Sequence, residues 1–333
     1  IGITLGFLGM GFVLYTITLG AYNTIFVPKA QPTLAPVLPG ISIPGVPALT
    51  FWHWIIAILI TAAVHEFFHG VYARLYKIKI KSSGFALLGP ILAAFVEPEE
   101  ENLKKIRYRK QLAIFSAGPF ANVITAFIFL LILNFATGPM QLNILEMQGI
   151  TVNEILPGYP AEQAGMTAPV TITAIDGQET LSGINFTEIT SKLKPNQTIV
   201  LETEKGNYII TTTQNPDNAS KGFMGVGGLV QKTGIKKDVE QKYGTFWPKA
   251  LLWTNMLLMW LFVINLGIGI FNLLPLGPVD GGRMFYVVSL WIFKDKKRAM
   301  KAWALTSFIC ISLIIVNLIP WLNKLLNFIL NFF

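Results

Sequence analysis

The chain has 333 residues, of which 53% are hydrophobic and only 13% charged, and its mean hydropathy is +0.55. Soluble domains are usually about 25% charged, so this composition excludes an ordinary soluble protein and indicates a polytopic membrane protein. The single cysteine, Cys310, excludes a disulfide framework and a cysteine-rich zinc site. The net charge of +8 comes from basic clusters beside apolar segments, a pattern that sets membrane topology, and we expect no nucleic-acid partner.

Apolar runs long enough to cross a bilayer recur along the chain, and we predict an α-helical protein with about six membrane segments. The first run is predicted as a spanning helix, with an uncleaved signal-like anchor as the alternative. A proline-rich irregular loop follows it at 28–51. The apolar runs lie at 1–27, 51–76, 112–137, 246–274 and 302–319, with shorter stretches at 284–293 and from Trp321 onward, the last of them interfacial or partly inserted.

A different pattern lies between the third and fourth long runs. Residues 140–245 alternate apolar and polar side chains between turn signals such as Pro157-Gly158 and Asp176-Gly177, which predicts a soluble β-rich insert. We therefore predict an N-terminal membrane region at 1–139, an inserted domain at 140–245 and a C-terminal membrane region at 246–333.

Lysine and arginine cluster at 74–110 and 294–301, and such loops face the cytoplasm. The insert then lies outside, and the 51–76 and 246–274 runs both cross from outside to inside. Their inner ends reach a similar depth, toward the cytoplasmic side. We predict a multi-pass protein of a prokaryotic cell membrane, with the lipid bilayer as its surroundings.

The second run contains the sequence His65-Glu66-Phe67-Phe68-His69. Positions four apart share a helix face, so both imidazoles can bind one metal ion, and Glu66 can reach a water on that ion. Two of the three histidines of the chain lie in this motif, at a depth where ionisable groups are costly and usually functional. A structural packing role for the pair is the alternative, and we favour metal binding.

Catalytic zinc takes three protein ligands and keeps one position open, so a third ligand is required. Asp280 lies in a stretch broken by Pro275, Gly277 and Pro278 at the end of an apolar run. Irregular backbone at membrane depth is tolerated only where it is buried in protein or lines a wet cavity. An interfacial turn is the alternative, but the depth shared with the histidines favours a ligand.

We therefore predict one Zn²⁺ per chain, held by His65, His69 and Asp280. The remaining histidine, His53, lies beside Trp52 and more than three helical turns from His65. It is expected to be an interfacial anchor and is rejected as a ligand.

These motifs together resemble the site-2 protease family of intramembrane metalloproteases. The resemblance rests on HEFFH within a span, followed far downstream by N-x-x-P-x-x-x-x-D-G at 272–281. The Gly118-Pro119-Phe-Ala-Asn122 segment is similar to that family's Gly-Pro-x-x-Asn element, and Gly84–Pro98 resembles its membrane re-entrant β-loop. The resemblance covers the three core spans and the insert, and the paired motifs are specific together.

The resemblance implies a zinc metalloendopeptidase that hydrolyses peptide bonds within transmembrane segments of membrane protein substrates, as in regulated intramembrane proteolysis. It implies that Glu66 is the general base and that Asn272 holds the substrate or the developing oxyanion. It also implies substrate contacts at Asn122 and Gly84, whereas helix–helix hydrogen bonding is the alternative for both asparagines. A catalytically inactive scaffold and a metal-ion transporter are the alternative functions.

The insert resembles a PDZ domain of the circularly permuted bacterial type. Residues 149–166 match its strand, turn and helix opening, and 172–177 match the following strand and turn. Such a domain binds extended peptides by adding a strand to its sheet, which implies a peptide ligand. A steric cap with no ligand is the alternative.

Overall fold

The computed structural model describes residues 1–28, 32–41, 46–88 and 91–330. Parts of the predicted 28–51 loop, residues 89–90 of the predicted re-entrant loop and the last three residues of the C-terminal tail lie outside the described residues. The chain divides into two compact units, one made of Ile1–Gly138 and Trp253–Phe333, the other of Pro139–Leu252.

Within the described part of the chain, five helical runs are long and apolar enough to cross a membrane. They are α1 (Gly2–Phe26), α2 (Phe51–Leu75), the continuous run of α4 (Tyr108–Ile132), the π-helical η1 (Leu133–Thr137) and α5 (Gly138–Ile144), then α9 (Phe246–Phe271) and α11 (Lys296–Leu330). Large apolar side chains such as Phe12 and Phe308 stay exposed on their outer faces, as expected for lipid contact.

Helix α10 (Asp280–Phe293) has 14 residues. At 1.5 Å per residue it is about 21 Å long, which is short of the roughly 30 Å hydrocarbon core. It is therefore not one of the described helices of spanning length, and the count of about six membrane segments stays a prediction.

Two helices extend beyond their predicted bounds. The third run, predicted at 112–137, continues to Ile144 because η1 and α5 prolong α4 without a break. The last run, predicted to end at Ile319, continues through Pro320 to Leu330. Here Trp321 donates from Nε1 to the carbonyl oxygen of Leu34 at 2.8 Å, so a tertiary contact holds the helix where proline alone would favour an end.

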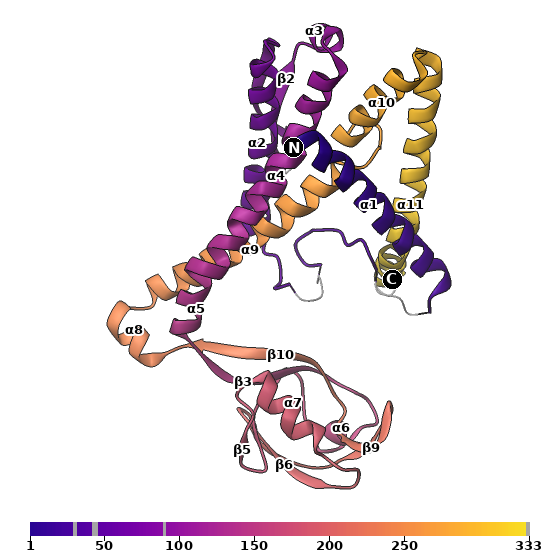
Figure 1. Ribbon diagram of the computed structural model, residues 1–333. Coiled ribbons are helices and arrows are strands. Elements are labelled where there is room, and N and C mark those ends of the chain that lie inside the picture. The colour runs from indigo at the N-terminus through magenta and orange to yellow at the C-terminus, as the bar shows by residue number, and fades with distance from the viewer. Residues whose placement is uncertain (29–31, 42–45, 89–90, 331–333) are drawn as a thin grey trace. The chain divides into compact units, whose positions relative to one another are not determined.

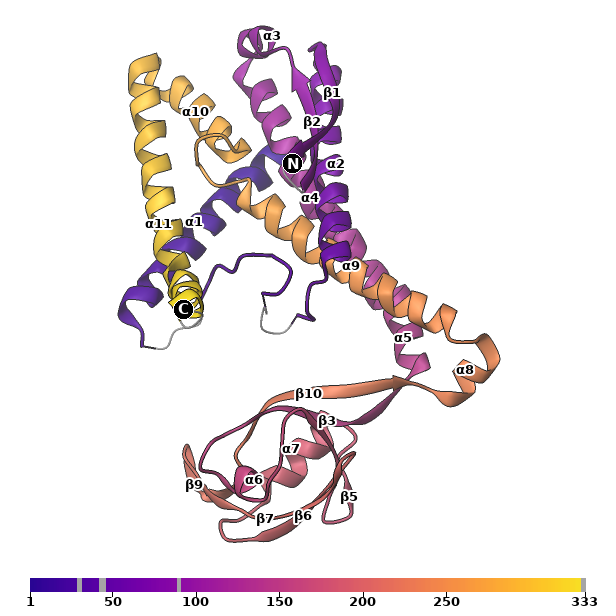
Figure 2. The same ribbon diagram turned by 180° about the vertical axis from the view of Figure 1, so that it is seen from behind.

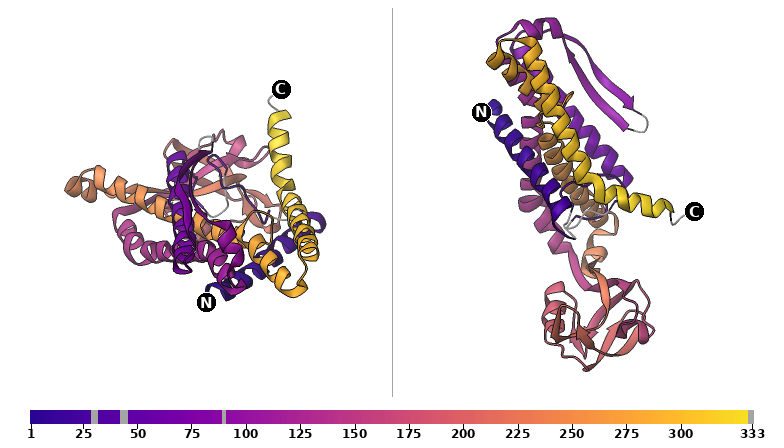
Figure 3. Two further views of the ribbon diagram at one scale, coloured as in Figure 1. Left: turned by 90° about the horizontal axis from the view of Figure 1, so that it is seen from above. Right: turned by 90° about the vertical axis from the view of Figure 1, so that its right-hand side faces the viewer.

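The first unit is built around α4, which packs against α1, α2 and α10 (Figure 1). These helices share a core that includes Met10, Ala73, Ile114, Leu273 and Met284. The first and last helices, α1 and α11, lie side by side (Figure 3), and Asn317 donates from Nδ2 to the carbonyl oxygen of Ile17 at 2.8 Å. Segments from both ends of the sequence are thereby joined.

A β-hairpin lies against α2 (Figure 2). Strand β1 (Ile80–Leu88) pairs antiparallel with β2 (Ile91–Pro98), and β2 packs on α2. Helix α3 (Glu100–Lys105) then leads from the hairpin to α4. The segment predicted as a β-loop is therefore a hairpin held beside the helix that carries His65 and His69.

The second unit is rich in β-structure, as predicted for the insert. Its main sheet has the strand order β10-β3-β4-β6-β7, with β5 paired to β4, and β8 pairs separately with β9. Val152, Ile172 and Leu201 are fully buried in its core. The elements are β3 (Leu145–Ile155), α6 (Pro160–Gln163), β4 (Val170–Ile175), β5 (Gln178–Glu179), α7 (Gly183–Ser191), β6 (Thr198–Thr203), β7 (Gly206–Thr211), β8 (Thr213–Asn215), β9 (Asn218–Phe223), β10 (Val226–Ile235) and α8 (Lys237–Tyr243).

Candidate metal centre

Three predicted ligands meet within the first unit. His65 and His69 lie one helical turn apart on α2, and Asp280 is the first residue of α10. All three side chains are buried, with exposed fractions of 8%, 8% and 7%. Among the described residues they form the one group of three or more His, Cys, Asp or Glu side chains with donor atoms close enough to share a metal.

The three donor atoms form a tight triangle. His65 Nε2 lies 3.0 Å from Asp280 Oδ2 and 3.1 Å from His69 Nε2, and His69 Nε2 lies 3.2 Å from the same carboxylate oxygen. Zinc–ligand bonds of about 2.0–2.2 Å at tetrahedral angles place ligand atoms about 3.3–3.6 Å apart. The observed separations are within a few tenths of an ångström of that range, so this donor set fits a zinc ion.

The other ring nitrogens of the two histidines are also engaged. Nδ1 of His69 lies 2.8 Å from the carbonyl oxygen of Ile114, and Nδ1 of His65 lies 3.1 Å from Nδ2 of Asn122. A carbonyl oxygen can only accept, so the His69 contact places a proton on Nδ1 and a lone pair on Nε2, toward the candidate metal. Such outer contacts orient metal-binding imidazoles.

The backbone before α10 folds back on itself to place Asp280. The N–H of Gly281 donates to the carbonyl oxygen of Asn272 at 2.7 Å, and the N–H of Gly277 donates to Ser307 Oγ at 2.9 Å. A Cβ at Gly281 would lie 2.2 Å from the carbonyl oxygen of Leu273, so only glycine fits this approach. The break keeps its backbone groups bonded inside the protein, as membrane depth requires.

A comparison with known protein families covers the part of the chain that carries these residues. The sequence profile described as Peptidase family M50 matches residues 53–315, which include every candidate ligand. The chain belongs to peptidase family M50. The resemblance to site-2 proteases is therefore confirmed, and with five apolar helical runs the protein is a multi-pass membrane member of a metalloprotease family.

Three relatives illustrate the similarity. An uncharacterised protein of Methanocaldococcus jannaschii is 31% identical over 68% of this chain and 54% of its own length, so this chain spans about half of that relative. A protein of Clostridium perfringens assigned by name to the zinc metalloproteases is 23% identical over 70% of this chain and 81% of its own. Protease RseP of Photorhabdus luminescens is 23% identical over 41% of this chain and 82% of its own.

One residue of the M50 site was not assigned from the sequence. Gly118 on α4 faces both imidazoles, because a Cβ there would lie 2.4 Å from His69 Nε2 and 2.7 Å from His65 Nε2. Glycine therefore leaves room for the two donors against the α4 backbone. The available signal was a Gly-Pro pair in the middle of an apolar run, where glycine weakens a helix unless close packing requires it.

Glu66, the predicted general base of the M50 site, follows His65 on α2 and is partly buried. One of its carboxylate oxygens, Oε2, accepts a hydrogen bond from the backbone N–H of Val96 on β2 at 3.0 Å. The hairpin thus supplies a backbone donor to the residue beside the metal ligands. Sequence reasoning did not identify this contact, because a backbone N–H carries no residue-type signal.

The remaining candidate residues lie in different surroundings. Asn272 is partly buried just after α9, next to the Asp280 loop. Asn122 is fully buried on α4 and contacts His65. Gly84 is exposed on β1, where it pairs with Phe95.

His53 is a buried structural residue rather than the interfacial anchor expected from the sequence. It is 2% exposed, and its Nδ1 lies 2.6 Å from Thr50 Oγ1 while its Nε2 lies 3.1 Å from the carbonyl oxygen of Trp253. The Nε2 contact joins the start of α2 to α9, and the Nδ1 contact is local to the start of α2, so both ring nitrogens have protein partners.

Proposed function

We propose that this protein is a zinc metalloendopeptidase that hydrolyses peptide bonds within transmembrane segments of other membrane proteins. The observation that carries the proposal is the convergence of His65, His69 and Asp280 donor atoms in a buried site beside Glu66. When bound there, zinc supplies a Lewis acid that polarises a peptide carbonyl and makes a water molecule nucleophilic near neutral pH.

Glu66 would act as the general base. A carboxylate next to the ligand His65 can accept a proton from the attacking water and pass it to the leaving amine. Its hydrogen bond to the Val96 N–H holds one oxygen in place and leaves the other available. Asn272, beside the Asp280 loop, carries an amide donor suited to the oxyanion that develops on the carbonyl.

The substrate segment must unwind before it can be cut, because the peptide groups of an intact helix are hydrogen-bonded and shielded. Each freed backbone group costs several kcal/mol in lipid unless it finds a partner. The β1–β2 hairpin has only two strands, so an extended substrate segment can pair with it. Gly84 would keep part of β1 open to that segment, since it has no side chain.

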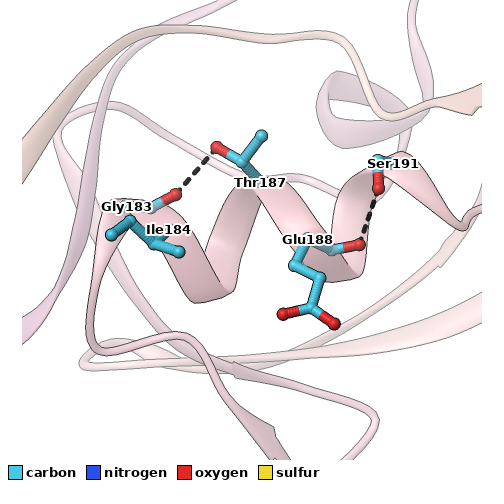
Figure 4. A pocket seen from close by; sticks show the side chains of 5 residues that line it. All are labelled: Gly183, Ile184, Thr187, Glu188 and Ser191. Atoms are coloured by element: carbon cyan, nitrogen blue, oxygen red, sulfur yellow. Dashed lines mark hydrogen bonds between the residues drawn. The ribbon is translucent and has the colours of Figure 1, made fainter.

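The insert supports a second partner, an extended peptide. Strand β10 is at the edge of the main sheet. The side chain of Gln231 on this strand accepts a hydrogen bond of 2.8 Å from the N–H of Gly183, at the start of α7. A pocket of about 490 Å³ lies along α7 (Figure 4), where Ile184 is 80% exposed. Thr187 and Ser191 in this pocket donate to carbonyl oxygens of their own helix. The exposed Ile184 is therefore the candidate peptide contact.

Fluorescence anisotropy with extended peptides tests this partner. Ile184→Glu should abolish peptide binding, because it places a charge where an apolar side chain is needed. The matched control Ile209→Glu, at an isoleucine that is 70% exposed on β7, should bind as wild type does. If the wild type binds none of the peptides, the result favours a steric role for the insert.

The basic clusters at 74–110 and 294–301 support a cytoplasmic position for the adjoining ends of the membrane helices in a prokaryotic cell membrane. In that orientation the metal site lies toward the cytoplasmic side and the insert lies outside. Labelling of single cysteines placed in these clusters, in intact cells and in inverted vesicles, tests this orientation.

Glu66→Gln tests the catalytic proposal. The amide cannot accept the proton, so cleavage of a single-span substrate should fall at least about 100-fold, whereas zinc content should stay at one ion per chain. Metal analysis and a cleavage assay on purified protein measure both quantities. Undiminished cleavage by the zinc-loaded variant would defeat the assignment of Glu66.

The same variant separates the alternatives. An inactive scaffold predicts that Glu66→Gln retains every cellular phenotype of the wild type. A metal transporter predicts zinc uptake into sealed vesicles that contain the protein. Cleavage by wild type without such uptake supports the protease.

A further inference from the structure

Asn122 is a buried residue that contacts the candidate metal ligand His65. It lies on α4 with no exposed surface, and its Nδ2 lies 3.1 Å from Nδ1 of His65. Its Oδ1 is also buried, and it has no hydrogen-bond partner among the described residues. Because Asn122 has no exposed surface, its contact with His65 indicates a role at that imidazole.

The two candidate ligands on α2 differ in the group that holds their outer nitrogen. The Ile114 carbonyl can only accept, so it allows a single tautomer of His69. The Asn122 amide can donate or accept. Its side chain lies 3.1 Å from Nδ1 of His65, while Nε2 of His65 lies 3.0 Å from Asp280 Oδ2.

A metal that binds His65 through Nε2 needs the lone pair of that nitrogen. Metal binding requires the proton to lie on Nδ1, and Nδ1 then needs an acceptor. A half-turn of the Asn122 amide presents Oδ1 to the same nitrogen. In the described structure no residue other than Asn122 is within hydrogen-bond distance of that nitrogen.

We propose that Asn122 is a positioning residue that holds His65 in the tautomer that binds zinc, with its side-chain oxygen accepting a hydrogen bond from Nδ1 of His65. This role differs from the substrate contact that the family resemblance implies. It rests on the proposed function for the identity of the metal.

Zinc affinity of the purified full chain, measured by competition with a chelator, tests the proposal. Asn122→Leu removes the acceptor and should weaken zinc binding about 10- to 100-fold. Asn122→Asp offers only an acceptor and favours the binding tautomer at all times, so its affinity should equal or exceed that of the wild type. The matched control is Asn265→Leu, at another fully buried asparagine, which donates to Leu261 of its own helix. It should bind zinc as wild type does.

Nitrogen NMR of ¹⁵N-histidine-labelled protein provides a readout that a packing role would not change. The chain has three histidines, so the signals can be assigned by substitution. The His65 ring proton should lie on Nδ1 in the wild type and in Asn122→Asp. In Asn122→Leu, which offers no acceptor, the proton should be shared between the two ring nitrogens.

The outcomes are distinguishable. Wild-type zinc affinity in Asn122→Leu, or a His65 ring proton on Nε2 in the wild type, overturns this proposal and leaves the proposed function intact. A wild-type chain that binds no zinc overturns both. The aspartate variant and the NMR experiment do not depend on the leucine variant, so they decide the matter even where that variant does not fold.

Discussion

At the scale of single residues, the candidate metal site depends on two glycines as much as on its ligands. Gly118 lets two imidazoles lie against α4, and Gly281 lets the start of α10 lie against the backbone of Leu273. Neither glycine has a positive φ, so the requirement is space rather than backbone conformation. A methyl group at either position would enter volume that is already filled.

Gly118→Ala should therefore weaken zinc binding at least about 10-fold, a loss of roughly 1.4 kcal/mol or more, because both ligands would have to move while their outer nitrogens hold them. Gly267→Ala on α9 is the control, since a Cβ there has no atom within 4 Å. Chelator competition on both variants measures the effect. Equal affinities in the two variants would show that the site tolerates the methyl group.

At the scale of elements, the β1–β2 hairpin contacts the helix that carries the proposed general base. It packs on α2, and the Val96 N–H donates to Glu66. The donor is part of the backbone, so the position of Glu66 depends on the path of the whole strand. Any extended segment that pairs with the hairpin would lie close to the proposed general base.

Val96→Pro removes this donor. A hydrogen bond to a charged group is worth about 1.5–3 kcal/mol, so the cleavage rate should fall about 10-fold or more while zinc affinity stays unchanged. Val96→Ala keeps the N–H and should retain most of the activity. A proline variant that cleaves at the rate of the alanine variant would show that the contact does not position Glu66.

At the scale of the whole molecule, one site joins distant parts of the chain. Asp280 contacts His65 and His69 across separations of 215 and 211 residues. All three donors belong to the first unit, and the insert contributes none of them. A metal bound there cross-links α2 to α10, so it stabilises the folded state over the unfolded chain.

Zinc should therefore raise the thermal unfolding temperature of the solubilised protein. At a free concentration of about 100 times its dissociation constant, the stabilisation should be about 2.7 kcal/mol. A chelator should reverse the shift, and His65→Ala should not show it. A shift of equal size in His65→Ala would place the stabilising metal elsewhere.

Much of this protein was predictable from local patterns. Apolar runs predicted the membrane helices, and the four-residue spacing of His65 and His69 predicted their shared face. The end of α11 was misplaced because Pro320 indicates an end, whereas the contact of Trp321 with Leu34 continues the helix. Helix α10, which contains the short apolar stretch at 284–293, has 14 residues and is too short to span a bilayer.

The candidate zinc ligands and the candidate base were predicted from side-chain chemistry and helical spacing, which can be read along the chain. Their surroundings were found only in the folded protein: the Val96 N–H on Glu66, the open face at Gly118 and the Asn122 amide on His65. These contacts form between segments that are distant in the chain. A backbone donor or a missing methyl group becomes significant only once another element packs against it.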